Sequence, residues 1–325
     1  MSKGESMKRN RLLFIFIGFI VILFSITLFF ITCSPGGTPT DHFKEGDALF
    51  AQQKWDEAIQ EYTKAIALDR QFVDAYRKRA EALSKKRDVH DAIFDYKKII
   101  ELDPENVNNY LKLASLYSSQ GSNSNAITTI KEAMEIDPEN PLLFQMAGDI
   151  YDAMGRNQDA LSSYSKAINL APSRSVYYLS RANFYLKISE YDKALADYSQ
   201  AIRIDPDNEK PYLNRANFYV QRESYDLAMS DYDKAIQLNS KYYSAYLRRG
   251  RLYRTLEDSQ KAIADFTKAI QIYPEVIWAY DARAKIYASE NMKTQAINDY
   301  LKIISLTTDE NLIAKLSQKI EELKE

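Results

Sequence analysis

The sequence repeats one pattern every 34 residues, without gap or insertion, from residue 39 to residue 310. When the residues of each copy are numbered from 1 to 34, position 20 is alanine in all eight copies and position 8 is always glycine or alanine. Position 4 is aromatic in seven copies, and position 24 is Tyr or Phe in seven. Such a period indicates an array in which each unit stacks on the next, so we expect one elongated domain.

Each copy is predicted to form two short helices. Positions 4, 8 and 11, and then positions 20, 24 and 27, are three and four residues apart, which places each set on one face of an α-helix. The small residues at positions 8 and 20 let two helix backbones approach closely, and the rings at positions 4 and 24 fill the remaining space. Proline at position 32 in five copies ends the second helix. The fold class is therefore all-α.

This pattern resembles the tetratricopeptide repeat (TPR). The resemblance implies a right-handed superhelical solenoid of eight helix-turn-helix TPR units, whose first helices line a concave surface that binds peptides or proteins. The eight units are residues 39–72, 73–106, 107–140, 141–174, 175–208, 209–242, 243–276 and 277–310. Residues 311–325 place Leu312, Ile313, Leu316, Ile320 and Leu323 on one helical face, which predicts a capping helix. A docking helix for a second subunit is the alternative.

Charged residues at two positions of the repeat occur together. Five copies have Arg at position 7 and Asp at position 23, whereas the other three copies have neither. The pairs are Arg79 with Asp95, Arg181 with Asp197, Arg215 with Asp231, Arg249 with Asp265, and Arg283 with Asp299. We therefore predict an ion pair that bridges the two helices of each of these copies.

The N-terminal part of the chain predicts a membrane attachment. Residues 1–11 are basic, and residues 12–32 are an uncharged hydrophobic run long enough to cross a bilayer as a helix. The basic flank should stay in the cytoplasm, which places the repeats on the other side, in the periplasm or at the cell surface. Residues 33–38 are a linker, and Thr40 or Asp41 can cap the first helix of the array.

Cys33, the only cysteine, leaves two interpretations of residues 12–32 open. The length of the run favours an uncleaved anchor, because the apolar cores of signal peptides usually span roughly 7 to 15 residues. Alternatively the run resembles a bacterial lipoprotein signal, which is cut before a cysteine that is then lipidated. Phe30 and Thr32 match that motif poorly, but Cys33 stands where lipidation requires it.

No catalytic constellation is found, so an enzyme is not expected, and neither is a cofactor. The two histidines lie in different copies, and His42 occupies the aromatic position 4, where packing is the expected role. No metal site is predicted. A formal net charge of −2 gives no sign of nucleic-acid binding.

The resemblance assigns the concave surface to positions 2, 5, 9, 12 and 13. At these positions copies one to four have a net charge of −3, and copies five to eight have +4, so we expect the groove to be electrically polar along its axis. We expect the basic half to bind an extended or helical peptide, preferably an acidic one, through apolar anchors and charges. The candidate binding residues are Leu179, Asn183, Leu186, Lys187, Lys210, Leu213, Asn214, Asn217, Leu247, Arg248, Arg251, Arg254, Trp278 and Lys285. The alternative is that the leucines pack between neighbouring helices and the charges only confer solubility.

Some members of the family hold a C-terminal carboxylate with a set of Lys, Asn, Asn, Lys and Arg. Asn183, Asn214 and Arg248 match three of these positions, but both lysines are replaced, by Leu179 and Ser244. A complete carboxylate clamp is therefore not expected.

These features predict a membrane-tethered TPR scaffold that binds a peptide or protein partner in its groove, in the assembly of bacterial cell-envelope complexes. Two alternatives remain: a structural spacer or self-assembly protein without a groove ligand, and a cytosol-facing receptor on the outer membrane of an organelle. The sequence does not indicate an oligomeric state.

Overall fold

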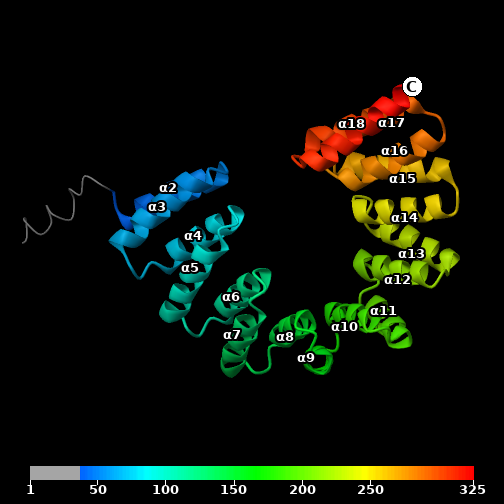
Figure 1. Cartoon of the computed structure of the whole chain (residues 1–325). Coiled ribbons are helices and arrows are strands. Elements are labelled where there is room, and N and C mark those ends of the chain that lie inside the picture. The colour runs from blue at the N-terminus through cyan, green and yellow to red at the C-terminus, as the bar shows by residue number, and fades with distance from the viewer. Residues whose placement is uncertain (1–36) are drawn as a thin grey trace, which may run out of the picture. The chain divides into compact units, whose positions relative to one another are not determined.

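The computed structural model describes residues 37–325, which form seventeen α-helices and, within that range, no β-strand (Figure 1). The chain divides into two compact units between Pro138 and Glu139, and each is described by itself. The first unit contains α2 (Pro39–Ala51), α3 (Trp55–Leu68), α4 (Val73–Lys85), α5 (Val89–Leu102), α6 (Val107–Ser119) and α7 (Asn123–Ile136). The second unit contains α8 (Pro141–Ala153), α9 (Asn157–Leu170), α10 (Ser175–Lys187), α11 (Tyr191–Ile204), α12 (Glu209–Gln221), α13 (Tyr225–Leu238), α14 (Tyr243–Thr255), α15 (Ser259–Ile272), α16 (Ile277–Ser289), α17 (Lys293–Leu306) and α18 (Glu310–Lys324).

The predicted all-α class and the two helices per copy are confirmed, and the helix pairs stack on one another within each unit. The predicted hydrophobic segment 12–32, the basic segment 1–11 and Cys33 lie outside the described residues. None of the helices within residues 37–325 is both apolar enough and long enough for a membrane span. The handedness of the superhelix stays a prediction.

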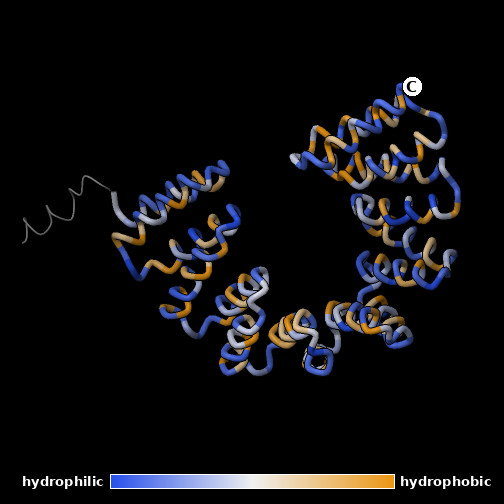
Figure 2. Tube along the Cα trace, in the orientation of Figure 1, coloured by the Kyte–Doolittle hydropathy of each residue, from blue (hydrophilic) through white to orange (hydrophobic). Residues whose placement is uncertain are grey.

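The core of each copy is built from its small and aromatic positions. All eight alanines at position 20 have 0% exposure, and the ring of Tyr198 at position 24 is also fully buried. A Cβ added at Gly46 or Gly148 would lie only 2.6 Å from the tyrosine ring at position 24 of the same copy, so these glycines allow the closest approach of ring and helix. In Figure 2, apolar residues recur at intervals along every helix, as expected for helices that bury one face.

The turn between the two helices of each copy has one residue with a left-handed backbone, at position 15. Its φ is positive in all eight copies, from 55° at Glu223 to 74° at Gly121. Only Gly121 and Gly155 are glycines at this position. The other six copies therefore hold an L-residue in a conformation that its Cβ disfavours.

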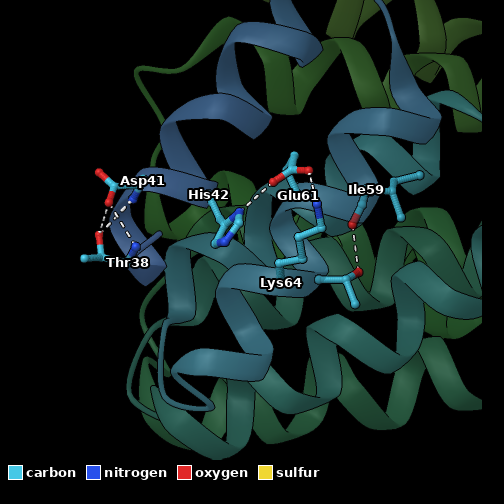
Figure 3. Close-up of polar contacts among 7 residues, drawn as sticks. Thr38, Asp41, His42, Ile59, Glu61 and Lys64 are labelled. Carbon is cyan, nitrogen blue, oxygen red and sulfur yellow. Dashed lines mark hydrogen bonds and ion pairs between the residues drawn. The ribbon is translucent and has the colours of Figure 1, made fainter. Parts of the chain in front are cut away.

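The first helix of the array is capped earlier than the sequence suggests. Thr38 is the N-cap of α2, and its Oγ1 accepts a hydrogen bond from the backbone N–H of Asp41 at 3.2 Å. The carboxylate of Asp41 accepts in return from the backbone N–H of Thr38 at 2.9 Å (Figure 3). Thr40 is inside the helix, so the predicted cap at Thr40 is wrong, and Asp41 is the second half of a capping box.

The predicted ion pair between positions 7 and 23 is present in all five copies. In the fifth copy, Arg181 Nε donates to Asp197 Oδ2 at 2.7 Å and Arg181 Nη2 donates to Oδ1 at 3.0 Å. The same two-bond geometry joins Arg79 to Asp95, Arg215 to Asp231, Arg249 to Asp265, and Arg283 to Asp299. The hydrogen bonds to Asp231 raise the pKa of Arg215, although burial acts in the opposite direction.

The third nitrogen of each arginine contacts the preceding copy. Arg181 Nη1 donates to Ser165 Oγ on α9 at 3.1 Å, so one guanidinium joins three helices. The equivalent acceptors are Thr63 for Arg79, Ser199 for Arg215, Asp233 for Arg249 and Thr267 for Arg283. The guanidinium also lies within 6 Å of aromatic rings on its own helix. Four of the five arginines contact the ring at position 4, and four contact the ring at position 11. We call this arrangement the three-helix arginine bridge.

The first copy replaces the bridge with a histidine. The ring Nδ1 of His42 on α2 lies 2.6 Å from Glu61 Oε2 on α3, and Lys64 donates to the other carboxylate oxygen at 2.6 Å (Figure 3). The hydrogen bond from Lys64 lowers the pKa of Glu61, against the effect of burial, and His42 adds to the lowering. His42 therefore has a polar contact across the two helices in addition to the packing role expected at position 4.

The C-terminal helix α18 covers the last repeat. Leu316 and Ile320 are 2% and 5% exposed and pack with Tyr300 and Ile303 of α17. Leu312 and Leu323 border the same cluster. This apolar face is turned to the last repeat, as a capping helix requires.

Candidate functional site

A pocket in the second unit lies between the first helices of copies seven and eight. It has a volume of about 350 Å³, and one wall is formed by α14 and the other by α16. From α14 it is lined by Leu247, Arg248, Arg251 and Arg254, and from α16 by Trp278, Asp281, Ala282 and Lys285. Six of these residues belong to the candidates named from the sequence. We call this space the arginine pocket.

Three arginines on α14 give the arginine pocket its charge. Arg248, Arg251 and Arg254 are spaced three residues apart, so they follow one another along one face of the helix. No described residue forms an ion pair with any of the three, although the partners of other arginines are well defined. Asp281, the acidic residue in the lining, is already bonded to Lys285 at 2.6 Å. The pocket therefore holds guanidinium groups whose hydrogen bonds are available to a ligand.

Trp278 on α16 separates the arginine pocket from a second pocket. Its side chain is 76% exposed, which is unusual for so large an apolar group. The second pocket, of about 270 Å³, lies between α16 and α18 and is lined on its apolar side by Ile303, Leu312 and Leu316. We call it the apolar pocket. Lys315 and Lys319 of α18 stand at its edge.

A third space of about 210 Å³ adjoins the arginine pocket on the side of α12. Arg248, Arg251 and Arg254 line it together with Asn217 and Val220. The first helices α12, α14 and α16, together with the C-terminal helix α18, thus border a row of neighbouring hollows within the second unit. This is the face that the sequence assigns to ligand binding.

The candidate asparagines already form hydrogen bonds with other side chains of the protein. Tyr198 donates its hydroxyl hydrogen to Asn183 Oδ1 at 2.8 Å, and Asn214 Nδ2 donates to the same oxygen at 3.2 Å. Tyr232 donates to Asn217 Oδ1 at 2.8 Å. Burial raises the pKa of Tyr232 to about 12. Asn183 therefore cannot offer its oxygen to a ligand without releasing Tyr198, which removes one member of the incomplete carboxylate clamp.

This link between positions 9 and 24 recurs in the first and fourth copies. Tyr62 donates to Asp47 at 2.8 Å and Tyr164 donates to Asp149 at 2.7 Å. The link is found in four of the eight copies, and the seventh copy cannot form it, because Phe266 at position 24 has no hydroxyl and Arg251 occupies position 9. The tyrosine-to-acceptor link is thus absent where the arginine pocket opens.

Other candidates prove less accessible than expected. Leu213 is 6% exposed and belongs to the core cluster of Tyr212 and Ala216, so little of its side chain is open to a ligand, and its role in a groove floor stays a prediction. Leu179 and Leu186 are half-buried and border the core cluster of Ala182 and Tyr185. These leucines contribute to packing between neighbouring first helices.

Two predicted basic residues have acidic neighbours. Lys187 Nζ lies 2.5 Å from Asp152 Oδ1 in the preceding copy, and Lys285 is bonded to Asp281. Lys210 is exposed, and its side chain has no bond to another described residue. The positive charge that remains available is therefore concentrated on α14.

His42, Glu45 and Glu61 in the first copy place three donor atoms within 4.8 Å of one another. A His nitrogen and two carboxylates are ligands that zinc accepts. Glu61, however, already binds His42 and Lys64 through both oxygens, so its carboxylate is satisfied without an ion. Glu45 and Glu61 occupy positions 7 and 23, which form the ion pair in other copies, so the repeat pattern places these two carboxylates close to each other.

Comparison with known families agrees with the fold. Models described as "TPR repeat" and "Tetratricopeptide repeat" match residues 46–86, 182–221, 243–276, 73–106, 107–140, 143–174 and 210–242, more than half of the chain. The chain belongs to the tetratricopeptide repeat family. A search of curated proteins finds no match.

Solved structures with the same fold are found at low sequence identity. The yeast Tom70 structure superposes with a TM-score of 0.67 at 19% identity, over 90% of this chain and 65% of that one. The Cut9 and Hcn1 hetero-tetramer of the APC/C gives 0.54 at 16% identity, over 86% of this chain and 55% of that one. A tetratricopeptide repeat protein from Parabacteroides merdae gives 0.54 at 19% identity, over 78% and 99%. This chain thus spans about two thirds of the Tom70 chain and about half of the Cut9 chain.

Proposed function

We propose that the protein is a membrane-tethered TPR scaffold that binds a peptide or protein partner on the first-helix face of copies five to eight, in the assembly of bacterial cell-envelope complexes. The observation that carries the proposal is the arginine pocket, where three unpaired guanidinium groups adjoin the exposed ring of Trp278. Exposed tryptophan and arginine side chains are enriched at the centres of protein interfaces. The proposed role requires no catalytic group.

A charge reversal on α14 tests the scaffold role. A photo-crosslinking residue is placed at Leu247 in the full chain, and the crosslinked proteins are compared with and without Arg251→Glu and Arg254→Glu. A scaffold loses its specific crosslink, because like charges then face the partner.

The matched control reverses two exposed charges on second helices, with Arg203→Glu and Lys268→Glu. It changes the net charge equally but leaves the pocket intact, so the crosslink should persist. If the wild type gives no specific crosslink from Leu247, the groove has no ligand, and the spacer or self-assembly function is favoured. If the pocket variant and the control crosslink as the wild type does, the charges of α14 do not hold the partner.

The tether is proposed from the uncharged run 12–32 and from Cys33. Membrane fractionation of the full chain tests the attachment, and labelling with a radioactive fatty acid tests the lipid. Incorporation that Cys33→Ala abolishes identifies a lipoprotein; membrane association without any label identifies an uncleaved anchor. Recovery of the intact protein in the soluble fraction contradicts both.

The repeats are proposed to lie outside the cytoplasm, because the basic residues 1–11 precede the hydrophobic run. Protease added to intact spheroplasts should degrade the repeats. Protection until the membrane is lysed would place them in the cytoplasm and favour the cytosol-facing receptor.

A further inference from the structure

The seventh copy differs from copies one, four, five and six at two positions that bind each other in those four copies. In copies one, four, five and six, a tyrosine at position 24 donates to an acceptor at position 9. Phe266 cannot donate, and Arg251 cannot accept. Arg251 is therefore exposed and unpaired, and its guanidinium faces the pocket.

Arg251 stands between two further unpaired arginines. Arg248 precedes Arg251 by three residues, and Arg254 follows it by three, about one helical turn in each direction. Like charges at this spacing destabilise a helix. In the sixth copy the same positions carry Asn214, Asn217 and Val220, so the fold does not require arginine there. The three cations destabilise the free protein, and this repulsion is relieved when an anion binds between them.

The spacing of the arginines indicates the kind of anion. Six residues of helix separate Arg248 from Arg254, which is roughly 9 Å at 1.5 Å per residue. Carboxylates on alternate residues of an extended chain are roughly 6.6 Å apart, so two of them can reach all three guanidinium groups. A single compact phosphate would contact fewer of them.

The neighbouring pocket adds an apolar requirement. Trp278 borders both the arginine pocket and the apolar pocket, and Leu312 and Leu316 form the far wall of the latter. A bound peptide whose carboxylates lie against α14 would pass over the ring of Trp278 towards α18. A large apolar side chain of that peptide, packed on the ring, would remove the face of Trp278 from water.

We propose that the arginine pocket and the apolar pocket together bind an extended acidic segment of a partner protein, with alternating carboxylates on Arg248, Arg251 and Arg254 and a neighbouring aromatic or aliphatic residue across Trp278. This inference rests on the proposed scaffold function and specifies its ligand. It differs from the carboxylate clamp of some family members, because its central residue is Arg251 and it needs no chain terminus.

Fluorescence anisotropy with the full chain in detergent micelles tests the proposal. The probe is a short fluorescein-labelled peptide of alternating Glu and Ser with one Phe at the end. It is compared with a peptide in which Gln replaces Glu and with one in which Ser replaces Phe. We expect the first peptide to bind at least about tenfold more tightly than either.

The decisive variant converts copy seven to the pattern of copy six. Arg251→Asn combined with Phe266→Tyr recreates the pair of Asn217 and Tyr232, so the fold has a satisfied hydrogen bond in place of the free cation. Binding should fall at least about tenfold, while the circular dichroism spectrum and melting temperature stay close to wild type. Arg254→Val, which copies Val220, is the second variant should the first not fold, and Arg203→Asn on α11 is the matched control.

Three results would overturn the proposal: equal binding by wild type and by the copy-six variant, equal binding of the Glu and Gln peptides, or binding of anionic lipid vesicles in place of the peptide. If none of the peptides binds while the crosslink from Leu247 persists, the ligand chemistry is wrong and the scaffold function stands. If the crosslink is also absent, both proposals fail.

Discussion

Arg181 on α10 and Asp197 on α11 share two parallel hydrogen bonds, at 2.7 and 3.0 Å, inside the fifth copy. The Asp197 residue is 7% exposed, so its charge depends on this partner. A buried carboxylate that loses its guanidinium stays desolvated without compensation, whereas removing both charges leaves no such penalty. The pair therefore makes a clear prediction for mutagenesis.

Replacing only one partner should destabilise the protein more than replacing both. Arg181→Leu alone should lower the free energy of unfolding by about 3 kcal/mol, because it strands Asp197. Arg181→Leu with Asp197→Thr reproduces the third copy, which has Leu113 and Thr129, and should cost about 1 kcal/mol. Urea unfolding followed by circular dichroism measures both; the reverse order would contradict the ion pair.

A glycine at position 15 should stabilise the copies that lack one. Glu223 has φ of 55°, so Glu223→Gly relieves backbone strain and should add about 1 kcal/mol to the free energy of unfolding. Gly155 has a φ of 71°, and no atom lies within 4 Å of the position that a Cβ would take, so Gly155→Ala should cost about the same amount through strain alone. Thermal melts of the two variants should shift in opposite directions; shifts of the same sign would show that backbone strain does not decide the effect.

Stability should fall in alkali because of the buried tyrosine hydroxyls. Burial raises the pKa of Tyr232 from 10.0 to about 12, so between these values the unfolded state has lost a proton that the native state retains. The contribution of this group is complete below pH 10, and about 3 kcal/mol of it is lost by pH 12.

Urea titrations at pH 9 and pH 11.5 measure the effect, and Tyr232→Phe should lose less stability between them than wild type does. Tyr273→Phe, at a residue 44% exposed, is the control. An identical pH dependence for wild type and Tyr232→Phe would exclude this group as a cause.

Truncation in the C-terminal helix compares a residue inside its apolar cluster with one outside the cluster. Leu316 is 2% exposed and packs in the cluster of Tyr300 and Ile303, so Leu316→Ala should cost about 2 to 4 kcal/mol. Ile313 is on the same helix but outside this cluster, so Ile313→Ala should lower the free energy of unfolding by less than about 1 kcal/mol. Guanidinium unfolding measures both variants, and equal losses of stability would show that α18 does not pack as described.

Much of the fold could be predicted from residue spacing. Position 20 is alanine in every copy and fully buried, as at Ala194 and Ala228, and the need for a small residue there is visible without coordinates. Arg181 and Asp197 can be paired from the sequence because both positions change together in eight copies. The copies of a repeat can be compared with one another as related sequences are. Two positions that change together from copy to copy therefore indicate a contact within the copy.

Contacts between copies are harder to recognise. Ser165 accepts a hydrogen bond from Arg181 in the next copy, and Lys187 binds Asp152 in the preceding copy. The two residues of each pair therefore belong to different copies, and comparing positions within one copy does not reveal them. The signal is nevertheless present: position 25 is Thr, Ser or Asp in each copy that precedes an arginine, but Lys97 and Lys131 precede copies without one.

The candidate site could be predicted only in part. The basic residues of α14 and Trp278 are identified from the sequence, because their positions follow from the family pattern. The burial of Leu213 is not, because position 5 lies where neighbouring first helices meet, and small differences in their packing decide whether a leucine is covered. The pairing of Asn183 with Tyr198 also escapes prediction, because position 9 varies from copy to copy while position 24 is tyrosine in six copies, so the two positions do not change together.

The three-helix arginine bridge restricts how such an array changes length during evolution. Recombination that removes residues 209–242 would bring Ser199 beside Arg249, which keeps a hydroxyl acceptor for the guanidinium. Recombination that removes residues 107–174 would bring Lys97 beside Arg181, so two cations would meet. Copies of equal length are therefore not freely interchangeable, and the order in which they follow one another is itself under selection.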